Sequence, residues 1–390
     1  MKNKLSILIL IYFALINTVN AKEKIKVFYS GFSFSNNYDS NKMFTQYTKK
    51  IVKNINTEDK LDIISNNLLK EIKKANFQNI NLDLENLLDF RKYPDNAIVM
   101  SVVMQHEEFS QEYSNSLKKF SGFYDSYFLI LFYDFSDKSL IASIPFEFEI
   151  PMLSNEKFDE AEVLKRIKEF YLKDKPFEEL IKIINQFNIK RKYDLRIGVT
   201  NVKIHERALN HMPKNTKKHL SSMKNLIAQT FSKRLSQNHN VAIVPYAEGQ
   251  SIGKAMKLRF VQSDEIYDIR IPNPDYHIAI EIKGFKKLLG QASAVEDLYL
   301  YGSFANIEIY QPDLNKYYFN ESLRGVTRVK IPKGQVDLND WRKYYYNLEI
   351  LFDNFSKNII KQNQKWMKEA SKKKIKKKLK ELKIVMDKLK

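Results

Sequence analysis

The chain has 390 residues, 44% of them hydrophobic, which is enough for one large domain or two of ordinary size, so general disorder is excluded. Cysteine is absent, which rules out disulfides, thiolate nucleophiles, cysteine-based zinc sites, iron–sulfur clusters and a lipidated N-terminal cysteine. The net charge is +19, but much of the surplus lies in residues 372–390, so the rest of the chain is mildly basic and a nucleic-acid partner is not implied.

The N-terminus has the pattern of a signal peptide over residues 1–21. Lys2 and Lys4 precede an apolar run, residues 5–16, and Val19-Asn20-Ala21 follows as a cleavage site. The apolar run is too short to cross about 30 Å of hydrocarbon as a helix. We therefore expect a mature protein in the periplasm or outside the cell that is not a lipoprotein.

Residues 22–189 are predicted to form a first α/β domain. Apolar and aromatic clusters predict strands, and apolar positions spaced by three and four residues predict helices. The predicted strands are 25–29, 98–104, 127–133 and 140–150, the last two forming a hairpin, and the predicted helices are 60–76, 156–172 and 177–187.

Residues 193–360 repeat that order of elements after the basic run at 190–192. The predicted strands are 195–199, 241–245, 276–285, 307–310 and 325–331, and the predicted helices are 215–236 and 338–360. The pattern therefore predicts an α/β (α+β) fold of two similar tandem domains, each a mixed sheet flanked by helices.

The order of these elements supports a resemblance to a known family. A leading strand, a long amphipathic helix, a strand ending in Val244-Pro245 and a terminal helix are similar to the periplasmic α/β domain shared by the curli-secretion lipoprotein and the N-terminal domain of TolB. Related domains occur in flagellar-motor ring proteins. The resemblance implies an envelope protein that binds other proteins. The chain departs from the family in having no lipidated cysteine, pore-forming hairpin or propeller repeat.

Most catalytic and cofactor motifs are absent from the sequence. The chain lacks the glycine patterns of an esterase elbow, a phosphate-binding loop and a dinucleotide turn. His106 and His205 each follow a predicted strand, but neither has a companion at ligand spacing, so we expect both in exposed polar loops. The sequence gives no reason to expect a bound metal or cofactor.

One pattern offers a catalytic alternative. Asp275, Glu281 and Lys283 resemble the Pro-Asp and Glu-x-Lys arrangement of metal-dependent nucleases, in which two carboxylates hold a divalent ion. Only five residues separate the two acids, however, and a Lys-rich chain contains several acid-x-Lys triplets by chance. In the alternative, purely structural interpretation, Glu281 and Lys283 lie on the polar face of a strand whose isoleucines face the core.

Residues 361–390 are predicted to form a basic amphipathic helix. Lysines surround an apolar stripe with spacings of three and four residues. The expected membrane- or partner-binding residues are Lys372, Lys373, Lys374, Ile375, Lys376, Lys377, Lys378, Leu379 and Leu382. The helix would bind anionic lipid, an acidic polymer or a partner helix, or else it is simply solvated. We expect its removal to leave the folding of the body almost unchanged.

These observations favour a secreted, non-enzymatic envelope protein with a structural or assembly role. Its expected partners are envelope proteins, including further copies of itself. The alternatives are a metal-dependent nuclease or hydrolase that uses Asp275, Glu281 and Lys283, and a binding module for an anionic polymer or lipid.

Overall fold

A computed structural model describes residues 24–35, 46–52, 62–84, 93–173, 176–246, 255–261, 263, 265–335 and 338–390. The predicted signal peptide, residues 1–21, lies outside the described residues. The predicted fold class is confirmed, because two mixed sheets are flanked by helices and the chain ends in a helix. Within the described ranges, no helix is both long and apolar enough to cross a membrane.

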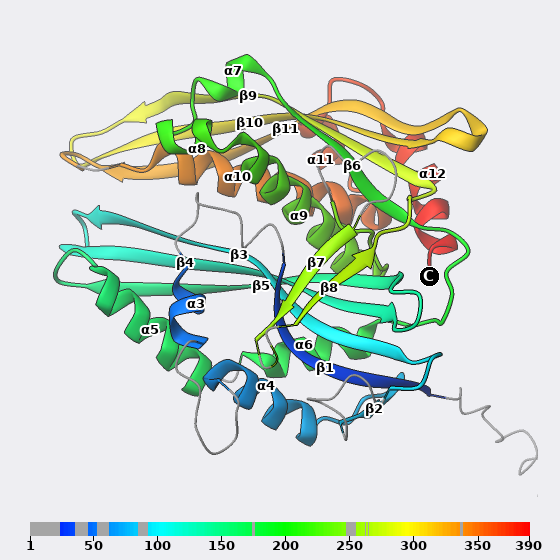
Figure 1. The fold of residues 1–390 in the computed structure, drawn as a ribbon. Helices are drawn as coiled ribbons and strands as arrows, with labels where there is room; N and C mark the ends of the chain where they lie inside the picture. The colour runs from blue at the N-terminus through cyan, green and yellow to red at the C-terminus, as the bar shows by residue number, and fades with distance from the viewer. Residues whose placement is uncertain are drawn as a thin grey trace, which may run out of the picture.

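The first sheet has seven strands in the order β5-β4-β3-β1-β7-β8, with β2 also paired to β1. They are β1 (Ile25–Ser35), β2 (Ile80–Asp83), β3 (Ile98–Ser114), β4 (Lys119–Asp134), β5 (Leu140–Ser154), β7 (Ala255–Phe260) and β8 (Ile266–Arg270). β1 is parallel to β2 and β3, and the other pairs are antiparallel. The helices on its outer face are α3 (Tyr47–Val52), α4 (Ile63–Lys74), α5 (Glu160–Lys173) and α6 (Phe177–Gln186) (Figure 1).

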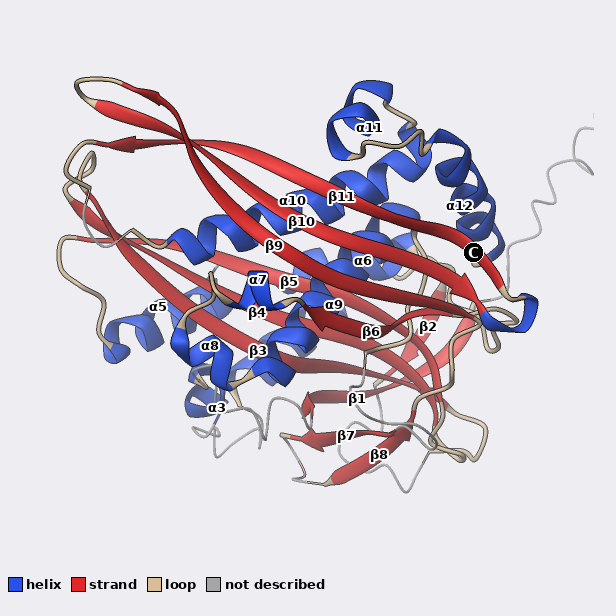
Figure 2. Cartoon of the chain, turned by 90° about the horizontal axis from the view of Figure 1, so that it is seen from above, coloured by secondary structure: helices blue, strands red, loops and turns tan. Residues whose placement is uncertain are grey.

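The second sheet has four strands in the order β11-β10-β9-β6, and its long strands form a twisted ribbon (Figure 2). They are β6 (Ile197–Ile204), β9 (Tyr276–Ala292), β10 (Glu296–Gln311) and β11 (Lys316–Pro332). The helices around it are α7 (Glu206–Leu209), α8 (Lys214–Lys218), α9 (Leu220–His239), the 3-10 turn η2 (Pro312–Leu314), α10 (Asp340–Lys361), α11 (Gln364–Ala370) and α12 (Lys376–Lys388). Because α9 and α10 lie between the two sheets, the layers run helix, sheet, helix, sheet (Figure 1).

The hairpin β7–β8 follows α9 in the chain but completes the first sheet. Ser33 of β1 pairs with Phe260 of β7, and Leu258 is fully buried there. The sequence analysis did not identify β7 and β8 as strands. The expected similarity of the two halves of the chain is not confirmed. The boundaries 22–189 and 193–360 stay a prediction, although the two segments share a sheet.

The predicted strand 241–245 is instead a crossing segment that makes one isolated bridge. Ile243 N donates to Ser143 O of the first sheet at 3.0 Å, and Val244 N donates to Ile197 O of the second at 2.9 Å. Val244 bridges to Gly198, where an added Cβ would lie 2.9 Å from the Val244 carbonyl oxygen. Only a residue without a side chain allows this approach, so the segment connects the sheets rather than extending either one.

Helix α10 packs closely against the inner face of the second sheet. The side-chain amide of Asn347 is buried and donates to Tyr301 O, Ser303 Oγ and Gly325 O at 3.0 Å each. An added Cβ at Gly325 would lie 3.1 Å from Leu351 Cβ. Gly325 and the three hydrogen bonds that Asn347 Nδ2 donates hold the helix at this distance, although Asn347 Oδ1 has no hydrogen-bond partner among the described residues. Helix α10 thus covers the inner face of the sheet and not the outer face.

The tail folds as two helices whose apolar stripe belongs to the core. Ile375, Leu379, Leu382 and Met386 are at most 1% exposed and pack with residues of α10 and the second sheet. The expectation that the tail adds little to the folding of the body is therefore wrong. Spacing identified the stripe correctly, but spacing alone cannot say whether the body or a partner covers it.

Candidate anion-binding groove

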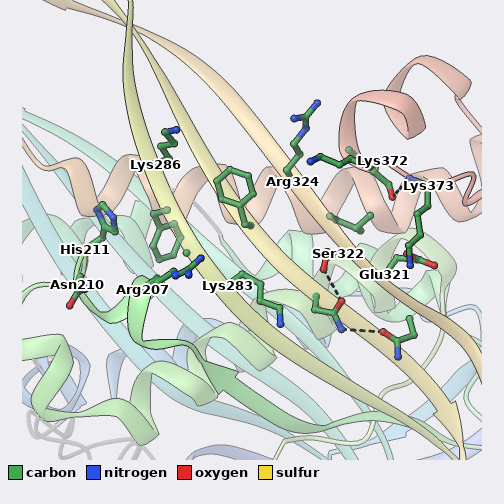
Figure 3. A pocket seen from close by; sticks show the side chains of 18 residues that line it. Arg207, Asn210, His211, Lys283, Lys286, Glu321, Ser322, Arg324, Lys372 and Lys373 are labelled. Carbon is green, nitrogen blue, oxygen red and sulfur yellow. Dashed lines mark hydrogen bonds and ion pairs between the residues drawn. The ribbon is translucent and has the colours of Figure 1, made fainter.

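The outer face of the second sheet forms the floor of an open groove of about 950 Å³. Helix α7 and the residues after it form one wall beside β9, and the loop between α11 and α12 forms the other beside β11 (Figure 3). The isoleucines of β9 point into the core. Because neighbouring residues in a strand point to opposite faces, the residues between and beyond these isoleucines point toward the floor of the groove. The groove is a consequence of α10 covering only the inner face.

Polar side chains and the rings of Phe285 and Phe304 line the floor. Phe304 is half-buried and lies opposite Arg324 of β11. Ser322 Oγ is 3.1 Å from Asn306 Oδ1, and Asn306 Nδ2 donates to Asn320 Oδ1 at 3.3 Å. This row crosses two strands and keeps further hydrogen-bonding capacity, because each amide group can make several bonds.

Basic side chains dominate the groove. Six of the eighteen lining residues are basic, and one is acidic. The basic residues are Arg207, Lys283, Lys286, Arg324, Lys372 and Lys373, and the acidic residue is Glu321. Lys283 pairs with Glu281 at 2.5 Å, whereas Arg207, Lys286 and Lys372 make no ion pair with any described carboxylate. Clustered charge of one sign raises the local concentration of oppositely charged ligands, so the groove is suited to anions.

The single acidic residue of the groove is already neutralised. Glu321 is 5% exposed, with Lys378 Nζ 2.5 Å and Lys373 Nζ 3.1 Å from its carboxylate oxygens. Burial alone would raise the pKa of Glu321, but hydrogen bonds from Lys378 and Lys373 outweigh that effect and lower the pKa below its ordinary value. The pairs also hold the α11–α12 loop against β11.

The structure divides the predicted tail residues into three groups. Lys372 and Lys373 line the groove, and Lys378 pairs with Glu321. The side chains of Lys374, Lys376 and Lys377 are exposed outside it, whereas Ile375, Leu379 and Leu382 are buried. The sequence therefore identified one wall of the groove, but not the sheet face opposite, since no local pattern links residues about 50 positions apart.

The structure does not bring Asp275 and Glu281 together. Asp275 Oδ2 accepts from Arg196 N at 2.7 Å before β9 begins, whereas Glu281 pairs with Lys283 farther along that strand. Six residues of strand extend about 20 Å, which is too far for one shared ion. Within the part of the chain that the structure describes, no three His, Asp or Glu residues are grouped to hold a metal.

His106 and His205, the two histidines considered in the sequence analysis, both make contacts that stabilise the fold. His106 is buried in β3, stacked on Tyr127 with ring centroids 4.1 Å apart, and burial lowers its pKa to about 3. The expectation of an exposed loop is wrong there because the strand continues ten residues past Met104. His205 Nδ1 accepts from Arg207 N at 3.2 Å and so caps the helix that carries Arg207 into the groove.

A second cavity, of about 50 Å³, lies between the first sheet and helices α9 and α10. Burial raises the pKa of Glu108 and of Glu349 to about 7 and lowers that of Lys233 to about 7. Arg342 Nη1 lies 3.1 Å from Asp125 Oδ2 in the same cluster. The cavity has room for a water molecule or two rather than an organic ligand. Its charged groups therefore affect the free energy of unfolding and the dependence of that free energy on pH.

Comparisons with known proteins add little to this geometry. No protein-family model matches the chain, and no curated protein matches it. Among solved structures, a putative neuraminyllactose-binding hemagglutinin homolog from Helicobacter pylori is 11% identical, with a TM-score of 0.25 over 41% of this chain and 85% of that one. A TM-score this low does not establish a shared fold. The expected resemblance to the curli-secretion and TolB domains stays a prediction.

Proposed function

We propose that this protein is a non-catalytic binding protein of the bacterial envelope whose groove holds an acidic polysaccharide. The observation that carries the proposal is the set of six basic side chains on both walls and the floor of one open groove. It corresponds to the anionic-polymer alternative of the sequence analysis. The envelope location rests on the predicted signal peptide.

The shape of the groove favours an extended ligand. Its floor follows three long antiparallel strands, and its walls come from chain segments on either side of them. Arg207 lies on one wall and Lys372 on the other, so the cations are spread across the width of the groove (Figure 3). A chain of regularly spaced carboxylates or sulfates would meet several of these cations at once, and each added contact strengthens the next by proximity.

The floor favours sugar over other anionic polymers. Asn306, Asn320 and Ser322 offer amide and hydroxyl groups that both donate and accept, as sugar hydroxyls require. The half-buried ring of Phe304 keeps an apolar edge open for one face of a sugar ring. A nucleic acid would use stacking on several aromatic rings. Of the two phenylalanines that line this groove, Phe285 is buried, so Phe304 is the one whose ring is partly exposed beside the amide row.

Binding measurements with defined polymers test the proposal. Protein beginning at Lys22 is titrated with fluorescently labelled polygalacturonate, neutral dextran and single-stranded DNA, and anisotropy is recorded. We expect binding of polygalacturonate that weakens as salt rises, because exposed charges are screened over about 10 Å at 0.1 M salt, and no binding of dextran. Absence of polygalacturonate binding would contradict the proposal, and tighter binding of DNA would contradict the choice of polymer.

A further inference from the structure

Hairpins from the two sheets end side by side at one end of the molecule. The β3–β4 turn and the β9–β10 turn project at the same end in both views (Figures 1 and 2). Asn115 N donates to Gln335 Oε1 at 3.1 Å, and Lys333 N donates to Val295 O at 2.8 Å. The loop after β11 therefore joins the two turns into one body, which we call the hairpin end.

Five large apolar side chains are exposed on the hairpin end, each between 47% and 75%: Leu117, Leu153, Leu288, Leu289 and Val295. A single exposed leucine is ordinary on a protein surface. A group of five at one end of a molecule is not: Leu117 and Val295 lie in the two turns, and Leu153, Leu288 and Leu289 lie in the strands that lead to this end. Leu117 and Val295 lie in short turns between paired strands, so these side chains can enter a soft layer more readily than they can match a flat protein surface.

Basic side chains surround this apolar group. Lys118 and Lys119 follow Leu117, while Lys286 and Arg328 lie on the outer face just behind Leu288, and all four are exposed. Two nearby acids are already paired, Glu296 with Lys330 at 2.5 Å and Asp297 with Lys333 at 2.7 Å, whereas Glu156, three residues after Leu153, is exposed. An apolar tip with a surplus of positive charge behind it matches the layered chemistry of an anionic bilayer surface.

We propose that the hairpin end docks on an anionic lipid bilayer. The five apolar side chains enter the interface between headgroups and acyl chains, and the four basic side chains contact lipid phosphates. Lys286 belongs both to this basic group and to the lining of the groove, so the membrane contact and the sugar site meet at that residue. Together they would place an acidic polymer next to the membrane surface. The charge of the basic side chains selects an anionic bilayer rather than a neutral one.

Sedimentation with vesicles tests the proposal. The probes are vesicles of phosphatidylglycerol and phosphatidylcholine in equal parts, and of phosphatidylcholine alone. We expect binding to the mixed vesicles only, and a loss of at least about tenfold in the double variant Leu289→Asp/Val295→Asp, because charge in the tip opposes entry into the interface. Thermal unfolding of the variant should match the parent, since both side chains are exposed.

The same ribbon supplies a matched control. Leu314 is 62% exposed in the β10–β11 turn, at the opposite end of β10, and Leu314→Asp should bind mixed vesicles as the parent does. The groove variant Lys372→Gln should also bind unchanged, which separates this proposal from sugar binding. The proposal is overturned if the parent does not bind mixed vesicles, if the tip variant binds normally, or if Leu314→Asp loses as much binding as the tip variant.

Tryptophan fluorescence gives an independent readout. A tryptophan at position 295 (Val295→Trp) should shift to shorter wavelength when mixed vesicles are added, whereas a tryptophan at position 314 (Leu314→Trp) should not. Trp341 and Trp366 of the parent provide the background spectrum that is subtracted. Equal spectra for free and vesicle-bound Val295→Trp would show that the tip does not enter the lipid and would overturn the proposal.

Discussion

Lys373 Nζ lies 3.1 Å from Glu321 Oε2, and this ion pair fixes the loop between α11 and α12 to strand β11. The loop forms one wall of the groove, so the position of Lys372 depends on the same contact. The tail is thus both a part of the core and a wall of the proposed binding site.

Replacing Glu321 tests that contact. Hydrogen bonds from the two lysines lower the pKa of Glu321 against the effect of burial. A carboxyl whose folded pKa is lowered stabilises the fold above its unfolded pKa, and this stabilisation is lost as pH falls through the folded value. Glu321→Gln should therefore lower the free energy of unfolding at pH 7 by about 1–3 kcal/mol. It should also reduce the loss of stability between pH 5 and pH 3. Chemical denaturation across this range gives the measurement, and identical curves for variant and parent would contradict the prediction.

The apolar face of α12 should contribute to global stability. Leu382 is fully buried, so Leu382→Ala should lower the free energy of unfolding by about 2–5 kcal/mol through lost burial and the cavity left behind. Ile384 is 59% exposed on the same helix, and Ile384→Ala is the control, with an expected change within about 0.5 kcal/mol. Equal small effects at both positions would mean that the tail does not pack as described.

The buried charges between the sheets should make stability fall as pH rises. Burial raises the pKa of Glu108 and Glu349 from 4.5 to about 7. A group with a raised folded pKa contributes stability below its unfolded value, and that contribution is lost as pH rises through the folded one. The double variant Glu108→Gln/Glu349→Gln should thus lose less stability than the parent between pH 4.5 and pH 7.

The control for that prediction is Glu156→Gln, an exposed carboxyl outside the cluster. The charged groups that face the cluster are Asp125, Glu147, Glu149, Lys233, Arg234 and Arg342. They remain in every variant, so differences between the denaturation curves report on the two replaced carboxyls. A double variant whose curve parallels that of the parent from pH 4.5 to pH 7 would refute the account of the buried charges.

Separate expression of the two segments tests the shared sheet. β7 lies beside β1, and Leu258 of β7 is fully buried against the first segment. Residues 22–189 alone would leave that edge of β1 unpaired, and residues 193–390 alone would expose Leu258. We expect neither segment to unfold cooperatively by calorimetry, and co-expression to restore one transition. Two cooperative transitions from the isolated segments would instead support independent domains.

Local patterns predicted most elements but not how they assemble. Strand 127–133 corresponds to β4 because it is a short, continuous apolar run, and helix 338–360 corresponds to α10 because its apolar residues recur at helical spacing. The hairpin β7–β8 was missed because its exposed and buried residues alternate over only five or six positions. The groove was half predicted: the lysine run at 372–378 is visible in the sequence, whereas Arg207 and Arg324 are isolated residues that only the tertiary fold brings near it.

The most direct test of the central claim compares two triple variants in polygalacturonate binding. Arg207→Gln/Arg324→Gln/Lys372→Gln removes one cation from each wall and one from the floor. Lys70→Gln/Lys165→Gln/Lys168→Gln removes the same charge from α4 and α5, away from the groove. We predict a loss of about 100-fold or more in affinity for the groove variant, at roughly 1 kcal/mol per contact. The second variant should bind within about twofold of the parent. Equal losses in the two triple variants would show that overall charge, rather than the groove, binds the polymer, and would contradict the account.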